Sequence, residues 1–170
     1  MRKAFTLIEL LVSITILSII MIFLYKSYAM LNQSNSIFKE ESKKIIDVQK
    51  IKKVIYYDFL LAQKDSIHIK NIQKGEDFVY LQSSNSIHQR FNPYITYIVK
   101  DKKLYRLESL KMLNSYDIEP NSEFDVDFLG EIEVFKVYKT TLKNKDRYLI
   151  NIDFIKNIHI LLKVKNLEDK

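Results

Sequence analysis

The stretch FTLIELLVSITILSIIMIFLY, residues Phe5–Tyr25, decides how the rest of the chain is organised. Its 21 residues include a single charged side chain, that of Glu9. As a helix rising about 1.5 Å per residue, the stretch would reach about 30 Å, the thickness of the hydrocarbon core of a bilayer. The short basic head at residues 1–4 favours a cytoplasmic N-terminus. The sequence therefore predicts one transmembrane helix over residues 5–25, with the rest of the chain outside that membrane.

The position of a small residue separates this stretch from an ordinary secretory signal. In such a signal the small-residue cleavage site follows the apolar segment. No convincing site follows Tyr28-Ala29-Met30, whereas Ala4 stands directly before the apolar run. Cleavage after Ala4 would remove the basic head and leave the apolar helix on the mature protein. The alternative is a plain single-span anchor whose Glu9 side chain extends to the interface.

This order of residues resembles a known processing signal. A short basic leader, a small residue and then Phe5-Thr6-Leu7 with Glu9 are similar to the type III signal of type IV pilins and pseudopilins. The resemblance implies that a prepilin peptidase cuts between Ala4 and Phe5 and methylates the new Phe5 amine. Ala4 departs from the glycine that is usual before the cut. The resemblance also implies a single-pass protein of a bacterial inner membrane, with a cytoplasmic N-terminus and a periplasmic C-terminal domain.

The acid inside the apolar run needs a partner. A carboxylate in a lipid-facing helix is costly unless it is paired. Cleavage after Ala4 would create an amine one helical turn from Glu9, and another on each neighbouring subunit. We expect Glu9 to pair with the Phe5 amine of a neighbour, which would fix the axial register of an assembly.

A second, amphipathic helical segment is predicted over residues 26–66. Whether the polar stretch at residues 32–36 breaks the helix is left open. One apolar stripe recurs every three or four positions, and it comprises Ile45, Val48, Ile51, Ile55, Phe59 and Ala62. We interpret this stripe as core for the sheet that follows, with a partner-helix seam as the alternative. The basic residues Lys50, Lys52 and Lys53 are interpreted as a solvated face.

From residue 67 to residue 170 the pattern changes to that of a β-rich periplasmic domain. Short runs of β-branched and aromatic residues predict strands at 77–82, 93–100, 104–108, 124–128, 131–141, 148–153 and 158–164. Residues 101–103 predict a hairpin turn, and Gly130 interrupts the strand pattern. The predicted fold class is α+β and pilin-like: a long N-terminal helix packed on an antiparallel β-sheet.

Three motifs of this body resemble the J-type minor pseudopilins (general secretion pathway protein J). They are a charged helix segment with Asp58 near its end, a strand–turn–strand with a Leu104-Tyr105-Arg106 return, and FLGEIEVFKVY at 128–138. The resemblance implies a structural subunit that helps initiate or cap a short pseudopilus of a type II secretion system. Its partners would be I-type and K-type minor pseudopilins and the major pseudopilin. The alternative is a minor pilin or pseudopilin of a type IV pilus or a DNA-uptake apparatus.

Charge gives weak support to a nucleic-acid partner. The net charge is +6, but the basic residues are scattered among acids. Removal of Arg2 and Lys3 with the leader would lower it from +6 to +4. We therefore expect DNA contact only in the alternative function.

No sequence pattern indicates catalysis, a cofactor or a metal site. The histidines are far apart at His68, His88 and His159, and each is expected to be a surface or strand residue.

Asp125 and Asp127 should share the solvated face of a strand. Whether they gather a calcium ion with Glu119 and Glu123 is left open, because EF-hand spacing is absent. The chain has no cysteine, and its two glycines are isolated, so disulfides and a phosphate-cradling loop are excluded. We predict a non-enzymatic protein.

Overall fold

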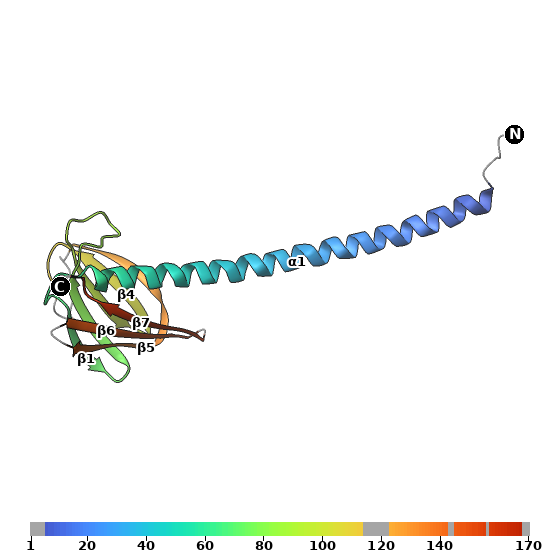
Figure 1. Cartoon of the computed structure of the whole chain (residues 1–170). Coiled ribbons are helices and arrows are strands. Elements are labelled where there is room, and N and C mark those ends of the chain that lie inside the picture. The colour runs from blue at the N-terminus through green and yellow to red at the C-terminus, as the bar shows by residue number, and fades with distance from the viewer. Residues whose placement is uncertain (1–5, 114–122, 143–144, 156, 168–170) are drawn as a thin grey trace. The chain divides into compact units, whose positions relative to one another are not determined.

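The structure is a computed structural model that describes residues 6–113, 123–142, 145–155 and 157–167. These residues form one helix and a seven-stranded sheet (Figure 1). In chain order the elements are α1 (Leu7–Leu60), β1 (His68–Gln73), β2 (Glu76–Gln82), β3 (Tyr94–Lys100), β4 (Lys103–Ser109), β5 (Phe124–Leu142), β6 (Lys145–Phe154) and β7 (Ile158–Lys165). The predicted α+β class, one long N-terminal helix followed by an antiparallel-rich sheet, is confirmed. The chain divides into two compact units, Met1–Val48 and Gln49–Lys170.

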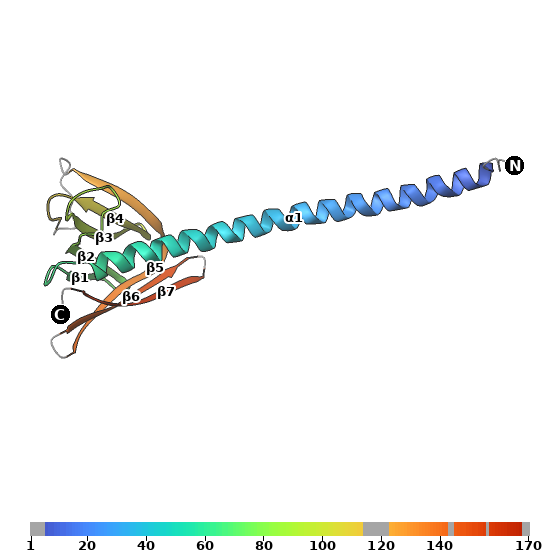
Figure 2. The same ribbon diagram turned by 45° about the horizontal axis from the view of Figure 1, so that its top comes forward.

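The described part of the first unit is helical from Leu7 onward. The polar stretch Asn32–Ser36 does not interrupt α1, which runs through it as regular helix (Figure 2). An 18-residue window of α1 has a mean hydropathy of 2.7, and none of it is buried. By length and composition this helix is able to cross a membrane.

In the second unit, the last turns of α1 pack on the sheet. Ile55 and Phe59 are completely buried, as is Ala62 just beyond the helix. Ile45, at the other end of the predicted stripe, is 61% exposed, so the stripe is core only in its later part. The helix ends at Leu60, and not at residue 66 as the sequence suggested. Beyond the helix, Ala62 forms an isolated bridge with Ser83, the residue that follows β2, instead of another helical turn.

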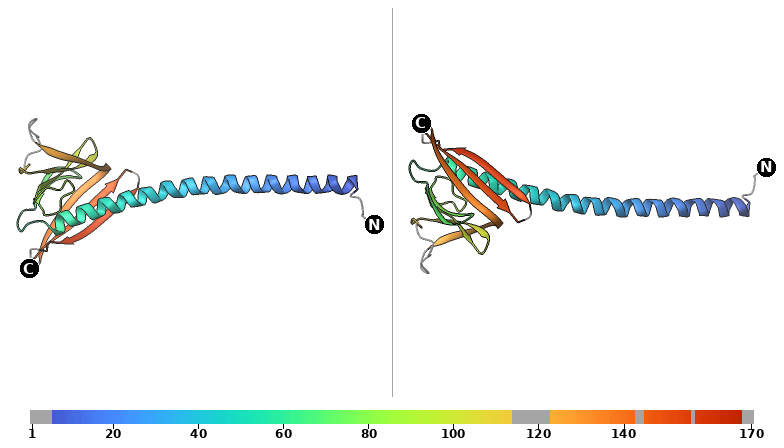
Figure 3. Two further views of the ribbon diagram at one scale, coloured as in Figure 1. Left: turned by 90° about the horizontal axis from the view of Figure 1, so that it is seen from above. Right: turned by 90° about the horizontal axis from the view of Figure 1, so that it is seen from below.

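The seven strands lie in chain order, β1 to β7, and each neighbouring pair is antiparallel. One parallel bridge, Glu76 to Phe135, also joins β2 to β5, so the sheet curls between these two strands. Figure 3 shows the curl from two sides. The curl encloses a small cluster of Phe78, Ile98 and Leu107. The helix side holds the larger core, where the Phe59 ring lies 6.2 Å from Tyr97 and 5.7 Å from Tyr148.

Most predicted strands are confirmed, and the hairpin turn is too. Lys100 pairs with Lys103, and the two residues between them have positive φ angles of 51° and 58°, as a two-residue type I′ turn requires. β1 was not predicted, because its sequence HIKNIQ lacks alternating apolar residues and five of its six residues are exposed.

The expected interruption at Gly130 is wrong. Residues 124–142 form one continuous strand of 19 residues, β5. Its pairing shifts register beside Gly130, between Leu104 and Tyr105 of β4. Gly130 has a φ of 144°, and a Cβ there would lie 2.7 Å from the Phe154 ring. The glycine therefore marks a bulge and a close approach within a strand.

Candidate functional site

The start of α1 is closed by a capping box. The Thr6 backbone N–H and its hydroxyl each donate to Oε2 of Glu9 at 2.9 Å, and the Glu9 N–H donates to the Thr6 hydroxyl at 3.4 Å. These bonds satisfy backbone donors that the first helical turn leaves without partners. Ala4 and Phe5, the predicted processing residues, lie outside the described residues. The predicted pairing of Glu9 with a Phe5 amine stays a prediction.

Sequence reasoning missed this local role of Glu9. The pattern Thr6-Leu7-Ile8-Glu9 is the Ser/Thr-x-x-Glu signature of a capping box, and it could have been read directly. Both Thr6 bonds reach Oε2, and no bond within the described chain engages Oε1. The carboxylate can therefore cap its own helix and still accept a further donor.

The hydroxyl groups in the apolar run bond to their own helix. Ser13 donates to the Glu9 carbonyl, Thr15 to the Val12 carbonyl and Ser18 to the Ile14 carbonyl, each at 2.8 Å. Such back-bonding satisfies a hydroxyl without an external partner. The hydroxyl donors are thus already used, whereas Glu9, the charged side chain of this run, keeps a carboxylate oxygen that can accept an external donor.

A second polar site surrounds Asp58, in the last turn of α1. Asp58 is completely buried on the same stripe as Ile55 and Phe59. Its carboxylate meets Arg106 of β4 in two bonds, Nε to Oδ2 at 2.7 Å and Nη2 to Oδ1 at 3.2 Å. The Tyr97 hydroxyl donates at 2.5 Å and the Asn85 amide at 2.6 Å. The buried carboxylate is therefore held by one cation and two neutral donors.

Arg106 joins Asp58 to two further carboxylates. Its Nη1 lies 2.8 Å from Oε2 of Glu108 and 3.2 Å from Oδ2 of Asp127, and the Arg106 side chain is 0% exposed. Glu108 also accepts the backbone N–H of Ile87 at 3.0 Å and the hydroxyl of Ser86. We call Asp58, Tyr97, Arg106, Glu108 and Asp127 the ionic cluster. It joins α1 to three strands.

The charges of the ionic cluster shift one another's pKa values. Burial raises the pKa of Asp58, and the opposite charge of Arg106 counteracts part of that shift. Burial disfavours the charged form of Arg106, but pairing with Asp58 outweighs it and raises the Arg106 pKa, so the guanidinium stays charged. Burial also acts against ionised Glu108, yet bonds from Ser86 and Arg106 hold its pKa below its ordinary value of 4.5.

The loop between β2 and β3 is anchored to the same cluster. Besides Asn85 and Ser86, the loop contributes His88, whose Nε2 lies 3.1 Å from Asp127. Arg90 donates to Asp125 through Nε at 2.9 Å and Nη2 at 2.7 Å. Asp125 and Asp127 do share one face of β5, as predicted, but that face is only partly solvated. Basic partners distant in sequence leave the Asp125 side chain 38% exposed and the Asp127 side chain 24% exposed.

The histidines and acids do not form a metal centre within the described chain. No group of three His, Cys, Asp or Glu side chains there could hold a metal ion. His68 stacks on Tyr80 with ring centroids 4.8 Å apart, and His159 contacts Asp153. Glu119, one of the acids considered for calcium, lies outside the described residues.

Sequence reasoning named both Asp58 and Arg106 but did not pair them. They lie in separate motifs, 48 positions apart. The available signal was an acid on an apolar stripe, since Asp58 follows Ile55 by three positions and precedes Ala62 by four. A carboxylate in that place must find a cation or several donors. Asp58, Arg106 and Glu108 are completely buried, and only Asp127 reaches solvent, with 24% of its side chain exposed. The arrangement therefore suits a structural role that holds α1 against the sheet.

Comparison with known proteins identifies one feature. Residues 1–25 match the family model described as the prokaryotic N-terminal methylation motif. No curated protein and no solved structure matches the chain. The motif indicates a type IV pilin-like or pseudopilin subunit, which implies prepilin peptidase processing and assembly into a pilin-like filament. Together with the apolar N-terminal helix, it fits a single-pass inner-membrane protein.

Proposed function

We propose that the chain is a minor pseudopilin-like subunit that helps initiate or cap a short pseudopilus of a type II secretion system. The observation that carries this proposal is the methylation motif over residues 1–25, placed on a helix that continues to Leu60. Such a subunit works by assembly and carries out no reaction of its own. The prepilin peptidase would act on it between Ala4 and Phe5.

The division of the chain follows from this proposal. Residues 1–4 would be removed as a leader, and residues 5–25 would span the inner membrane with the N-terminus in the cytoplasm. Residues 26–66 would form the periplasmic part of the helix and the short segment that follows it. Residues 67–170 would form the β-rich periplasmic domain.

Glu9 would serve two partners in the assembled state. Its Oε2 accepts both bonds from Thr6, so the cap occupies one side of the carboxylate. Its Oε1 is left to accept the methylated Phe5 amine of a neighbouring subunit. Pairing of the two charges would offset the unfavourable transfer of each into the membrane.

The ionic cluster supports the J-type assignment. Two of the three motifs that resemble J-type minor pseudopilins contribute Asp58 and Arg106, and these residues contact each other at 2.7 Å. A buried ion pair of this kind holds one helix face against the sheet. The I-type, K-type and major pseudopilins would then be the partners.

Co-purification from inner membranes tests this function. The tagged chain would be expressed with the I-type, K-type and major pseudopilins of its own host, and separately with the minor pilins of a pilus or DNA-uptake system. We expect recovery of the I-type and K-type subunits, and loss of that recovery in Glu9→Gln. Glu41→Gln is the matched control, because Glu41 lies on the same helix in an exposed pair with Lys44. Recovery of only the pilus or DNA-uptake subunits would replace the secretion assignment with the alternative.

A further inference from the structure

The two edges of the sheet differ in how open they are to another strand. β1, at one edge, has six residues, and its pairing with β2 shifts register between Asn71 and Gln73. β7, at the other edge, has eight residues in unbroken register with β6 from Ile158 to Lys165. In the described chain no strand lies outside β7. A long and regular edge is a template for an added strand, whereas a short and shifted edge is not.

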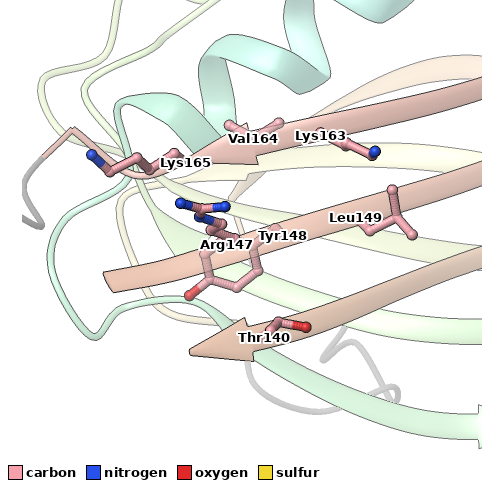
Figure 4. A pocket seen from close by; sticks show the side chains of 7 residues that line it. All are labelled: Thr140, Arg147, Tyr148, Leu149, Lys163, Val164 and Lys165. Carbon is pink, nitrogen blue, oxygen red and sulfur yellow. The ribbon is translucent and has the colours of Figure 1, made fainter. Parts of the chain in front are cut away.

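A groove containing three cations runs beside this edge. Arg147 of β6 is the pairing partner of Lys165, and Leu149 of β6 is the partner of Lys163, so these side chains share one face of the sheet. With Thr140 of β5 they line an open groove of about 420 Å³ (Figure 4). We call Arg147, Lys163 and Lys165 the β7 cations.

The β7 cations lack carboxylate partners within the described residues. All three residues are exposed, and among the described residues no hydrogen bond or ion pair engages the charged groups of their side chains. Two other cations of the same unit are paired, by contrast: Lys136 lies 2.7 Å from Asp77, and Lys139 lies 2.5 Å from Asp146. The positive charge at the β7 edge is therefore available to an external anion.

We propose that the β7 edge binds an acidic, extended polypeptide segment as an added strand. Its backbone would form a ladder with the outer edge of β7, and its carboxylates would reach the β7 cations. Lysines on an edge strand normally oppose pairing with other strands. Here the lysines would repel a basic strand but attract an acidic one, so they would select the added strand by its charge.

Two other occupants fit the same surface less well. A second copy of the chain would bring its own Lys163 and Lys165 to the edge, and like charges repel. Single-stranded nucleic acid is held by exposed aromatic rings as well as by cations. Tyr148, which lines the groove, is only 4% exposed, so Tyr138, the 54% exposed pairing partner of Leu149, offers a single open ring beside it. A nucleic acid also cannot continue a backbone ladder.

The proposal is independent of the pseudopilus assignment, and peptide binding tests it. The full chain would be held in zwitterionic detergent micelles and titrated with a fluorescent peptide of alternating Glu and Val. We expect saturable binding that weakens by about tenfold or more in Lys163→Glu, the loss expected when an ion-paired contact becomes repulsive. Lys100→Glu is the matched control, because Lys100 is an exposed strand lysine outside the groove, and it should bind like the unchanged chain.

Two further probes separate strand addition from simple attraction of charge. A peptide of the same sequence with N-methylated backbone amides keeps its carboxylates but loses its donors, so it should bind at least about tenfold more weakly. Amide exchange in β7 should slow when the unmodified peptide binds. Equal binding of the N-methylated peptide, unchanged β7 exchange, equal binding by Lys163→Glu, or tighter binding of single-stranded DNA would each overturn the proposal.

Discussion

Glu9 and Asp58 are acids of the same helix, and their partners lie at very different distances along the chain. The described bonds of the Glu9 side chain reach only Thr6, three positions away. Those of Asp58 reach Asn85, Tyr97 and Arg106, which are 27 to 48 positions away. The first unit therefore uses local bonds and leaves its apolar side chains exposed, whereas the second unit satisfies its own buried charge.

This difference assigns a separate role to each region. The exposed apolar surface of the first unit needs a surrounding that the chain does not supply, whether lipid or other subunits. The second unit holds its core and ionic cluster within one chain. Changes in the second unit should therefore act on folding, and changes in the first should act on processing and assembly.

Loss of Arg106 should have the largest effect on stability. Arg106→Ala would leave Asp58 and Glu108 buried without their shared cation, and breaking such an ion pair costs about 3–5 kcal/mol. Urea unfolding of the full chain in micelles, followed by near-UV circular dichroism, measures the change. Arg90→Ala is the control, because its pair with Asp125 is partly exposed and should contribute about 1 kcal/mol or less. Equal losses of unfolding free energy in the two variants would mean that the ionic cluster does not hold α1 against the sheet.

Substitution of Gly130 should come next. In Gly130→Ala the new Cβ would collide with the Phe154 ring at a positive φ, and overpacking of this kind costs about 1–3 kcal/mol. Gly75→Ala carries a positive φ of 96°, but the nearest atom to its Cβ, the Glu133 carbonyl oxygen, is 3.7 Å away. The same unfolding measurement should therefore show a smaller loss at Gly75. A larger loss at Gly75 would contradict the close approach of Gly130 in β5 to the Phe154 ring of β6.

The stability contributed by Glu108 should depend on pH. Its pKa is lower in the folded chain than the ordinary 4.5, so the unfolded chain takes up a proton first as the pH falls. The contribution is present above pH 4.5 and is lost as the pH falls through the folded-state pKa. The gap in unfolding free energy between the unchanged chain and Glu108→Gln should narrow in that window. A gap that stays constant down to acid pH would mean that Glu108 has the same pKa in the folded and unfolded chain, which would contradict the lowered pKa.

The helix cap should give the smallest effect, and it should be confined to the first unit. Thr6→Ala removes the side-chain acceptor of the Glu9 N–H and should cost about 1 kcal/mol of helix stability. Hydrogen exchange should speed up at the first turn of α1, while the urea midpoint of the second unit stays unchanged. A shift of that midpoint would show that the helix cap also affects the stability of the second unit.

The fold was predictable wherever neighbouring residues determine it. Strands β2, β3, β4, β6 and β7 and the turn at residues 101 and 102 follow from alternation and turn chemistry. β1 has no apolar face to detect. The continuity of β5 through Gly130 depends on pairing with both β4 and β6, which no local pattern contains.

The candidate sites divide in the same way. The methylation signal and the Thr6–Glu9 cap each lie within a few adjacent residues, so both can be recognised from the sequence. Asp58 could be recognised as an acid on an apolar stripe, but its partner could not be chosen among several basic residues. The pairing of Asp125 with Arg90 also depends on a loop whose path follows from tertiary structure alone.

Determination of the mature N-terminus tests the pilin-like identity most directly. The chain would be produced in a bacterium with a prepilin peptidase, extracted from the inner membrane and analysed by mass spectrometry of its N-terminal peptide. The result expected is a chain that begins at Phe5 with a methylated amine, and that keeps residues 1–4 when the peptidase is absent. A mature chain that still begins at Met1, or one cut after the apolar run near Ala29, would contradict that identity.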